Sequence, residues 1–431
     1  MSFYSDNNVS THYLDPSTYL PQSEASEGRI SFELDGTKLA FLPNMRLLNV
    51  GCDSDSLQVY NKLVGAYVVI SRIRLLDGDT ELSALTNQQL YRGFLNQNMT
   101  NSRSESTDSL LNVGAVGWSV DGQDRQIARV QNVKQAGGGA VGPQNLGYLD
   151  LREVFPILKS VSHLPTSVFK NLNIQIIMTG TKLNQVLFNV TAEVIGVRPI
   201  LAVDVLENPK IVDKMRKSLD SARWLEVEHD RFLIPQTTLD GAAGDHLISQ
   251  QTNVKINGFN NKHLERLVIV KELVDPASTV SGTNFQYGYG RWASPACFRQ
   301  QVQFRLNGRN ILPRNGIVGN NERLAYLIDT FGDCANYPGS NLYGLGPVGP
   351  GTAAHGYMDG ASQYIGALDY IGIYLGDYIN DLQINYSREG LEDTNAWRPT
   401  TMAMYAHCFG EVAKVLQIRS DNSYNVVYAQ N

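Results

Sequence analysis

The chain has 431 residues, of which 42% are hydrophobic and 18% are charged, and its formal net charge is −6. Charged residues make up about 25% of an average soluble domain, so much of this surface is neutral polar or in contact with other protein. The acidic balance excludes binding to nucleic acid through net charge. The length exceeds the size at which a single core stops growing, so we expect two domains.

The cysteines and the N-terminus narrow the class of protein further. Cys52, Cys297, Cys334 and Cys408 lack the spacing of a zinc site or a disulfide framework, so we expect reduced, packed thiols. The N-terminus lacks the basic and apolar regions of a signal peptide. No apolar run approaches the roughly 18 residues that a membrane span needs. We therefore expect synthesis in a reducing cytosol or nucleus and no transmembrane segment.

Residues 1–27 predict a flexible N-terminal arm. This segment has no Lys or Arg and few aliphatic residues, but it contains Tyr4, Tyr13 and Tyr19. Segments of low hydrophobicity at a terminus rarely join a core. Regular structure is expected from RISFEL at residues 29–34, whose apolar residues alternate with polar ones as in a half-buried strand.

A hairpin followed by a helix is expected next. The strand AYVVISRIRLL leads into Asp77-Gly78, a pair that favours a tight type I′ turn. Thr86 or Asn87 then fits the cap of a helix. The apolar face of that helix is expected to comprise Leu90, Phe94 and Leu95.

From about residue 100 to 148 the sequence loses periodicity, which indicates a long surface excursion. DLREVFPILKSV then predicts a helix with an Asp cap, kinked or cut short by Pro156. Two strands follow, NLNIQIIM and NVTAEVIGV. In the first of these, the residues expected on one face are Leu172, Ile174, Ile176 and Met178.

A helix over residues 207–222 is expected to link two β domains. Asn208 fits its cap and Pro209 its first position. The apolar stripe expected on this helix comprises Ile211, Val212, Met215 and Leu219. Its lysines fit a solvated face better than a binding patch.

The second half repeats the order of the first. CFRQQVQFRLNG leads into an Asn307-Gly308 turn, and NERLAYLID matches NQQLYRGFL in its Asn cap. A second Gly- and Pro-rich excursion follows at about 332–362. After it, DLQIN corresponds to NLNIQ of the first half. The chain therefore contains two copies of one β unit, over residues 28–206 and 223–431. The second copy ends in a polar C-terminal tail, SYNVVYAQN.

No motif indicates catalysis. AGGGAVGP lacks the Lys-Ser or Lys-Thr of a phosphate-binding loop, and DGDTE lacks the distal glutamate of a calcium loop. The seven histidines show no HxH or HExxH spacing. EVEHD at residues 226–230 reads as the exposed side of a strand. We expect no catalytic residue, no cofactor and no metal site.

Three stretches carry a family resemblance: GRISFELDGTKLAFLPNMRLLNVG, YNKLVGAYVVISRIRLLDG and LGYLDLREVFPILKSVSHLPTSVFKNLNIQI. In this order they resemble the double jelly-roll major capsid proteins of tailless double-stranded DNA viruses, in the style of polinton-like viruses and virophages. The resemblance is firmest over residues 28–200 and rests on order and size beyond them. It implies an all-β fold of two tandem eight-stranded jelly-roll barrels, with short helices in the connecting loops.

The resemblance also implies a structural role in the virion without an enzymatic step. Three chains would form a pseudo-hexameric capsomer, and these homotrimers would tile an icosahedral shell. The implied partners are neighbouring capsomers and the penton and minor capsid proteins. Because the arm is acidic, we expect it to dock on such proteins through its tyrosines rather than to bind nucleic acid.

The residues are also compatible with two other functions. A β-sandwich carbohydrate-binding or host-attachment (spike) protein would use aromatic side chains in Gly-rich loops to stack on sugars, although the same side chains could anchor loops. A β-rich glycoside hydrolase would hide paired carboxylates in its loops. The candidate interaction residues are Tyr4, Tyr13, Tyr19, Trp118, Trp292, Tyr357 and Tyr428.

Overall fold

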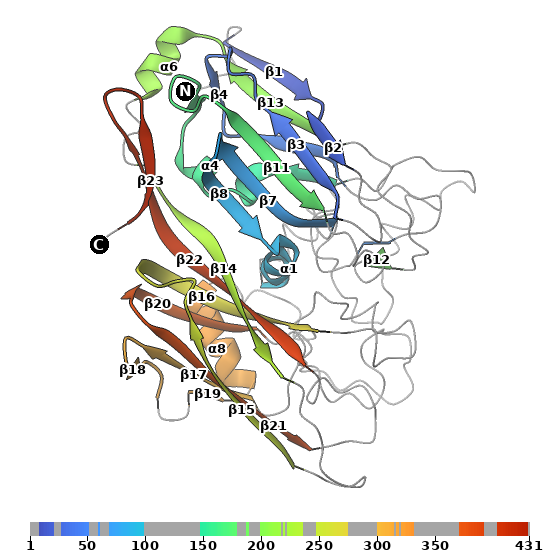
Figure 1. Cartoon of the computed structure of the whole chain (residues 1–431), viewed down its shortest axis with the longest axis vertical. Helices are drawn as coiled ribbons and strands as arrows, with labels where there is room; N and C mark the ends of the chain where they lie inside the picture. Colours follow the sequence, from blue (N-terminus) through green and yellow to red (C-terminus); the bar gives the residue numbers. More distant parts are fainter. Residues whose placement is uncertain are drawn as a thin grey trace, which may run out of the picture.

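The structure is a computed structural model of two β sandwiches stacked along the long axis of the molecule (Figure 1). It describes residues 8–20, 27–50, 59–60, 69–98, 147–178, 187–188, 199–216, 219, 222–235, 247–274, 300–313, 316–318, 320–331, 370–391 and 403–429. The first sandwich comes from the first half of the chain and the second from the second half. All strand pairings between described residues stay within one half.

The first sandwich has two main sheets. One contains β1 (Val9–Leu14), β4 (Ala40–Phe41), β5 (Arg46–Val50), β9 (Gly147–Asp150), β10 (Leu164–Pro165) and β13 (Ile200–Leu206). The other contains β2 (Thr18–Leu20), β3 (Arg29–Glu33), β7 (Ile70–Asp77), β8 (Thr80–Thr86) and β11 (Leu172–Met178). A separate small sheet pairs β6 (Val59–Tyr60) with β12 (Leu187–Phe188).

The second sandwich is built in the same way. One sheet contains β14 (Arg223–Ile234), β16 (Lys262–Leu273), β20 (Ile371–Ile379), β22 (Met404–Ile418) and β23 (Tyr424–Tyr428). The other contains β15 (Leu247–Ile256), β17 (Gln300–Leu306), β18 (Arg309–Asn310), β19 (Ile317–Val318) and β21 (Leu382–Leu391).

Strand order shows that the two sandwiches are copies of one topology. In the first, β1 pairs with β13, which pairs with β5 and then β9, while the facing sheet runs β3-β11-β7-β8. In the second, the matching orders are β14-β22-β16-β20 and β15-β21-β17-β18. These two sets take their strands in the same chain order, and each is an eight-stranded jelly roll. The expected all-β fold of two tandem jelly rolls is confirmed.

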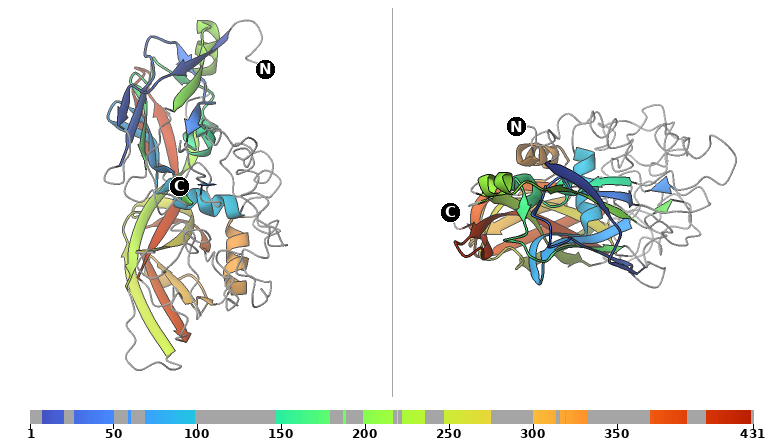
Figure 2. Two further views of the ribbon diagram at one scale, coloured as in Figure 1. Left: turned by 90° about the vertical axis from the view of Figure 1, so that its right-hand side faces the viewer. Right: turned by 90° about the horizontal axis from the view of Figure 1, so that it is seen from above.

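The helices occupy equivalent places in the two copies. α1 (Gln88–Asn98) follows β8, and α8 (Asn320–Phe331) follows the β17–β18 hairpin and β19. Both lie on the same side of the stacked sandwiches (Figure 2). The interrupted helix predicted after Asp150 is confirmed as a 3-10 turn, η3 (Leu151–Glu153), and a short α4 (Ile157–Ser160).

The helix α6 (Pro209–Arg216) lies between the two jelly rolls in sequence. Its predicted cap is confirmed, because the backbone N–H of Lys210 donates to Oδ1 of Asn208 at 3.0 Å. Its apolar stripe packs against the end of the first sandwich. That contact joins Ile211, Val212 and Met215 to Val9, Ala40 and Leu206.

The expected arm over residues 1–27 differs from the structure in its middle part. β1 pairs with β13 along its whole length, from Val9 opposite Leu206 to Leu14 opposite Leu201, so the first jelly roll begins at Val9 rather than at residue 28. The hydroxyl of Thr11 also donates to Oδ1 of the buried Asp204 at 2.7 Å. Pairing to a buried strand orders this segment despite its low hydrophobicity.

Part of the expected C-terminal tail is likewise a strand. β23 pairs with the last five residues of β22, from Lys414 opposite Tyr428 to Ile418 opposite Tyr424. The pairing folds the chain end back onto the sheet. Its polar side chains are therefore those of an edge strand rather than of a free tail.

The two hairpins that follow β7 and β17 differ in their turns. Asp77 pairs with Thr80, so the loop residues are Gly78 and Asp79, and only Gly78 has a positive φ (57°). The expected type I′ turn at Asp77-Gly78 is therefore wrong, because the loop lies one residue further along and its second residue, Asp79, lacks the positive φ that this turn requires. In the second hairpin both Asn307 (48°) and Gly308 (83°) have a positive φ, as a type I′ turn requires.

The alternation predicted for NLNIQIIM is confirmed, since Leu172, Ile174, Ile176 and Met178 are all buried in β11. The strand predicted at NVTAEVIGV and most of the two Gly-rich excursions lie outside the described residues. Most of the buried apolar side chains of the two jelly rolls form one continuous cluster. The sandwiches are thus packed on each other and share a core.

Candidate functional site

The described residues contain no arrangement of three or more His, Cys, Asp or Glu side chains that could hold a metal ion. None of the described helices is long and apolar enough to cross a membrane. Cys408 is a buried free thiol whose pKa is raised by burial, as expected for a packed cysteine. Buried polar and aromatic side chains concentrate instead where the two jelly rolls meet.

Helix α1 docks on the second jelly roll through aromatic side chains. Phe94 is fully buried, and its ring centroid lies 4.9 Å from that of Phe331 in α8 and 5.1 Å from that of Tyr370. One turn earlier, the ring of Tyr91 lies 5.3 Å from that of Phe409 in β22. Aromatic pairs at such distances stabilise an interface beyond the area that they bury.

A partly buried ion pair lies beside the hydroxyl of Tyr91. This hydroxyl donates to Oε1 of Glu411 at 2.9 Å, and Nε of Arg266 donates to Oε2 of the same carboxylate at 2.6 Å. Burial, with the charge of Glu411, raises the pKa of Tyr91 well above its ordinary value, so the phenol stays protonated. Each carboxylate oxygen therefore has a donor, Tyr91 from across the junction and Arg266 from within the second jelly roll.

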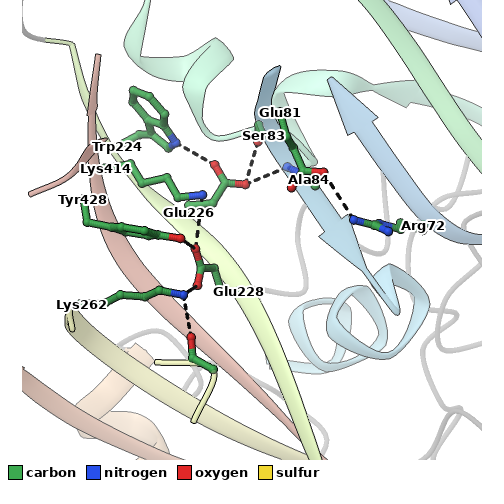
Figure 3. A network of polar contacts seen from close by, with 11 residues as sticks. Arg72, Glu81, Ser83, Ala84, Trp224, Glu226, Glu228, Lys262, Lys414 and Tyr428 are labelled. Carbon is green, nitrogen blue, oxygen red and sulfur yellow. Dashed lines mark hydrogen bonds and ion pairs between the residues drawn. The ribbon is translucent and has the colours of Figure 1, made fainter. Parts of the chain in front are cut away.

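A second polar contact between the two jelly rolls lies near the start of β14 (Figure 3). Glu226 is 1% exposed, and its carboxylate accepts hydrogen bonds from the Ser83 hydroxyl at 2.8 Å and the Ala84 backbone N–H at 3.0 Å. Nε1 of Trp224 donates to its other oxygen at 2.7 Å. Burial raises the pKa of Glu226. The two donors from β8 bind the first jelly roll to the second, and Trp224 orients the same carboxylate from within β14.

Two residues further along β14, the carboxylate of Glu228 is contacted by charged and aromatic side chains of the second jelly roll (Figure 3). Lys262 forms an ion pair with it, Lys414 lies 3.3 Å from Oε1, and the Tyr428 hydroxyl donates to Oε1 at 2.7 Å. Both ammonium groups also lie over the Tyr428 ring, at 4.8 Å and 5.3 Å from its centroid. The cluster fixes β23 to the sheet.

The β22–β23 hairpin reaches back to the first jelly roll. The Tyr424 hydroxyl donates to Oδ2 of Asp77 at 2.8 Å, and its ring lies 4.9 Å from that of Phe169. The turn of this hairpin is also hydrogen-bonded to α6, through Arg216 and Asn422. The junction is therefore held at α1, at β8 and at this hairpin, which makes the chain one body with two barrels.

The structure places three of the predicted interaction residues. Tyr13 is 68% exposed on β1, and Tyr19 on β2 is half-buried against the core. Tyr428 is 38% exposed and engaged with Glu228. The others, Tyr4, Trp118, Trp292 and Tyr357, lie outside the described residues. Their interaction roles stay predictions, and the described ones are not brought together in one site.

The residues of the junction were not among those predicted. EVEHD was expected on the exposed side of a strand, yet Glu226 is buried, because β8 of the other jelly roll covers it. Local alternation gives no information about a strand from another domain. The sequence signal that could have identified this site is a Glu two residues after Trp224, and therefore on the same face, in the first strand after the linker helix.

Comparisons with known proteins give the fold a context. No protein-family model and no curated protein sequence matches the chain. The structure is similar to the major capsid protein of mavirus, with a TM-score of 0.52 and 10% identity over 98% of this chain and 90% of that chain. It is similar to the Faustovirus major capsid protein, with a TM-score of 0.53 and 8% identity over 95% of this chain and 90% of that chain.

A third similarity is to a chain of the PBCV-1 virus capsid, with a TM-score of 0.51 and 11% identity over 100% of this chain and 99% of that chain. All three alignments run through both jelly rolls. At these identities the likeness establishes the fold. The chain has the double jelly-roll fold of viral major capsid proteins.

Proposed function

We propose that this chain is the major capsid protein of an icosahedral virus and that three copies form a pseudo-hexameric capsomer. One observation carries the proposal: two jelly rolls in one chain match viral capsid proteins over at least 95% of this chain. The role is structural and involves no chemical step.

The junction supports this role. Three chains with two similar barrels present six similar wedges, so a threefold trimer fills a lattice position with six neighbours. This requires the two barrels of one chain to keep a fixed relation. Buried contacts of Phe94, Tyr91 and Glu226 between the jelly rolls supply such rigidity.

We further propose that the partners of the trimer are neighbouring capsomers and penton and minor capsid proteins in the virion. Tyr13 is a candidate contact, because it is 68% exposed on an edge strand. A tyrosine offers a large contact area at a modest entropic cost. A net charge of −6 favours protein partners over direct contact with nucleic acid.

The solution mass of the purified chain tests the trimer, followed by negative-stain imaging of the same sample. A species of three times the 47.7 kDa chain mass with a hexagonal outline is expected. A stable monomer that forms no sheets or particles at high concentration would contradict the proposal. In a trimer that does form, Tyr13→Ser should leave the mass unchanged and reduce the ordered arrays that form on concentration.

A further inference from the structure

Two histidines face each other where α1 meets the second jelly roll. Nδ1 of His407 in β22 lies 2.9 Å from Nε2 of His229 in β14, and the ring centroids are 5.2 Å apart. His407 is 1% exposed. At 2.9 Å no water molecule or ion fits between the two nitrogens.

The contact continues at both ends. Oε2 of the buried Glu272 in β16 accepts a hydrogen bond from Nε2 of His407 at 2.9 Å. On the other side, Nδ2 of Asn87 lies 3.2 Å from Nε2 of His229. Asn87 belongs to the first jelly roll, and its carbonyl accepts from the backbone N–H of Leu90 at 3.0 Å in the first turn of α1. This chain of contacts ties the start of α1 to three strands of the second jelly roll.

The geometry limits the number of protons that the pair can hold. A neutral imidazole has one donor and one acceptor nitrogen, whereas a protonated imidazole has two donors. At the His229–His407 contact one nitrogen must donate and the other must accept. When both rings are fully protonated, two N–H groups point at each other at 2.9 Å and the contact becomes repulsive.

The surroundings of the pair disfavour additional charge on His229. Arg231 lies on the same strand, with its guanidinium 4.7 Å from the ring centroid of Tyr405, and that ring packs against His407. Beyond Phe409 on the same face lie Glu411, Arg266 and, on α1, Tyr91. Burial, with His407 and Arg231, lowers the pKa of His229 to about 3, and Glu272 opposes this shift.

We propose that these four residues, Asn87, His229, His407 and Glu272, form an acid-sensitive latch between the two jelly rolls. At neutral pH the latch holds the start of α1 on the second jelly roll, and at acid pH it releases it. Release of α1 withdraws Asn87 and opens the His229 ring to solvent, while His407 and Arg231 stay beside it on the second jelly roll. The pKa of the released His229 therefore rises towards the 6.5 of an exposed histidine, and below that pH the released state takes up a proton that the latched state excludes. The latch is therefore complete above about pH 6.5 and weakens as the pH falls towards about 3.

Hydrogen exchange of α1 in the full chain tests the latch, with rates corrected for the chemical effect of pH. Between pH 7.5 and pH 5.0, protection of residues 88–98 should fall by more than about threefold and by at most about thirtyfold relative to β11, because pH 5.0 lies 1.5 units below the pKa of about 6.5 that a fully exposed His229 would have. The variant His229→Gln removes the titration, so its loss should stay within about threefold. His163→Gln is the matched control, since His163 is also buried, with a pKa lowered to about 4 by burial, but lies within the first jelly roll. Its α1 should respond to acid as the wild type does.

A second variant keeps the test decisive if His229→Gln does not fold. Asn87→Asp places a carboxylate beside Nε2 of His229, where it favours the protonated ring, and Asp tolerates the positive φ of 49° at this position. It should reduce the acid-induced loss of α1 protection to less than about threefold. Equal losses in the wild type and both variants, or no loss in the wild type, would overturn the proposal. The experiment uses the isolated chain, so its outcome is independent of the capsid role.

Discussion

The two jelly rolls share a strand order but differ in the length of the strands that correspond. β1, which opens the first copy, has 6 residues, whereas its counterpart β14 has 12, and β22 has 15 residues against 7 in β13. The additional length of β14 carries Glu226 to the first sandwich, where it binds Ser83 and Ala84 of β8. The junction therefore uses strand length that the first copy lacks, although the topology of the two copies is the same.

The largest loss of stability is expected when a buried aromatic ring is removed from the junction. Phe94→Ala should cost about 3–5 kcal/mol, because it removes a fully buried ring between α1, Phe331 and Tyr370. Unfolding followed by circular dichroism in denaturant should then show two transitions, one for each jelly roll.

The matched control is Phe304→Ala, which removes an equally buried ring inside the second sandwich. It should cost a similar amount without separating the two jelly rolls, because α1 stays docked. If Phe94→Ala kept a single transition at the wild-type midpoint, the junction would not be what couples the two copies.

A smaller effect is expected at the ion pair between Arg266 and Glu411. Tyr91→Phe deletes the donor to Oε1 of Glu411 and leaves that oxygen without the hydrogen bond, at a cost of about 2 kcal/mol. Arg266 still binds the other oxygen, so the pair should persist. The free energy of unfolding measures the loss, and a value below about 0.5 kcal/mol would show that water replaces the phenol.

The two hairpins should respond differently to loss of a turn side chain. Asn307→Ala should cost about 1–2 kcal/mol, because Asn307 has a positive φ and its amide bonds Tyr378 O at 2.9 Å and Asn380 N at 2.8 Å. Asp79→Ala in the first hairpin should change stability by less than about 0.5 kcal/mol. Thermal unfolding compares them, and equal effects would contradict the difference in turn type.

The smallest effect is expected at the C-terminal hairpin. Tyr424→Phe removes a hydrogen bond to Asp77 at a partly buried position but keeps the packing on Phe169, so it should cost about 0.5–1 kcal/mol. Burial, with the bond to Asp77, raises the pKa of Tyr424, and its ultraviolet titration should therefore lie above that of an exposed tyrosine. An ordinary titration would show that the hydroxyl faces solvent.

Strong local patterns explain what the sequence could predict. β11 alternates strictly, α1 has its apolar residues on one face, and Asn307-Gly308 suits only a few turns. In each case the side chains that decide the structure are neighbours in the chain.

Contacts between distant segments explain what it could not predict. VSTHYL becomes β1 because β13 pairs with it and Asp204 accepts from Thr11, and neither partner is visible in a local window. Glu226 is buried by β8, which precedes it by more than a hundred residues. The junction thus depended on tertiary contacts that override local preference.

Electron cryomicroscopy of the purified assembly would show how the two barrels of each chain are arranged. We expect a threefold particle with six barrels in a ring, in which the first and second jelly rolls alternate and each pair keeps the junction described above. Isolated two-barrel chains, or barrels that vary in their relative orientation, would contradict it.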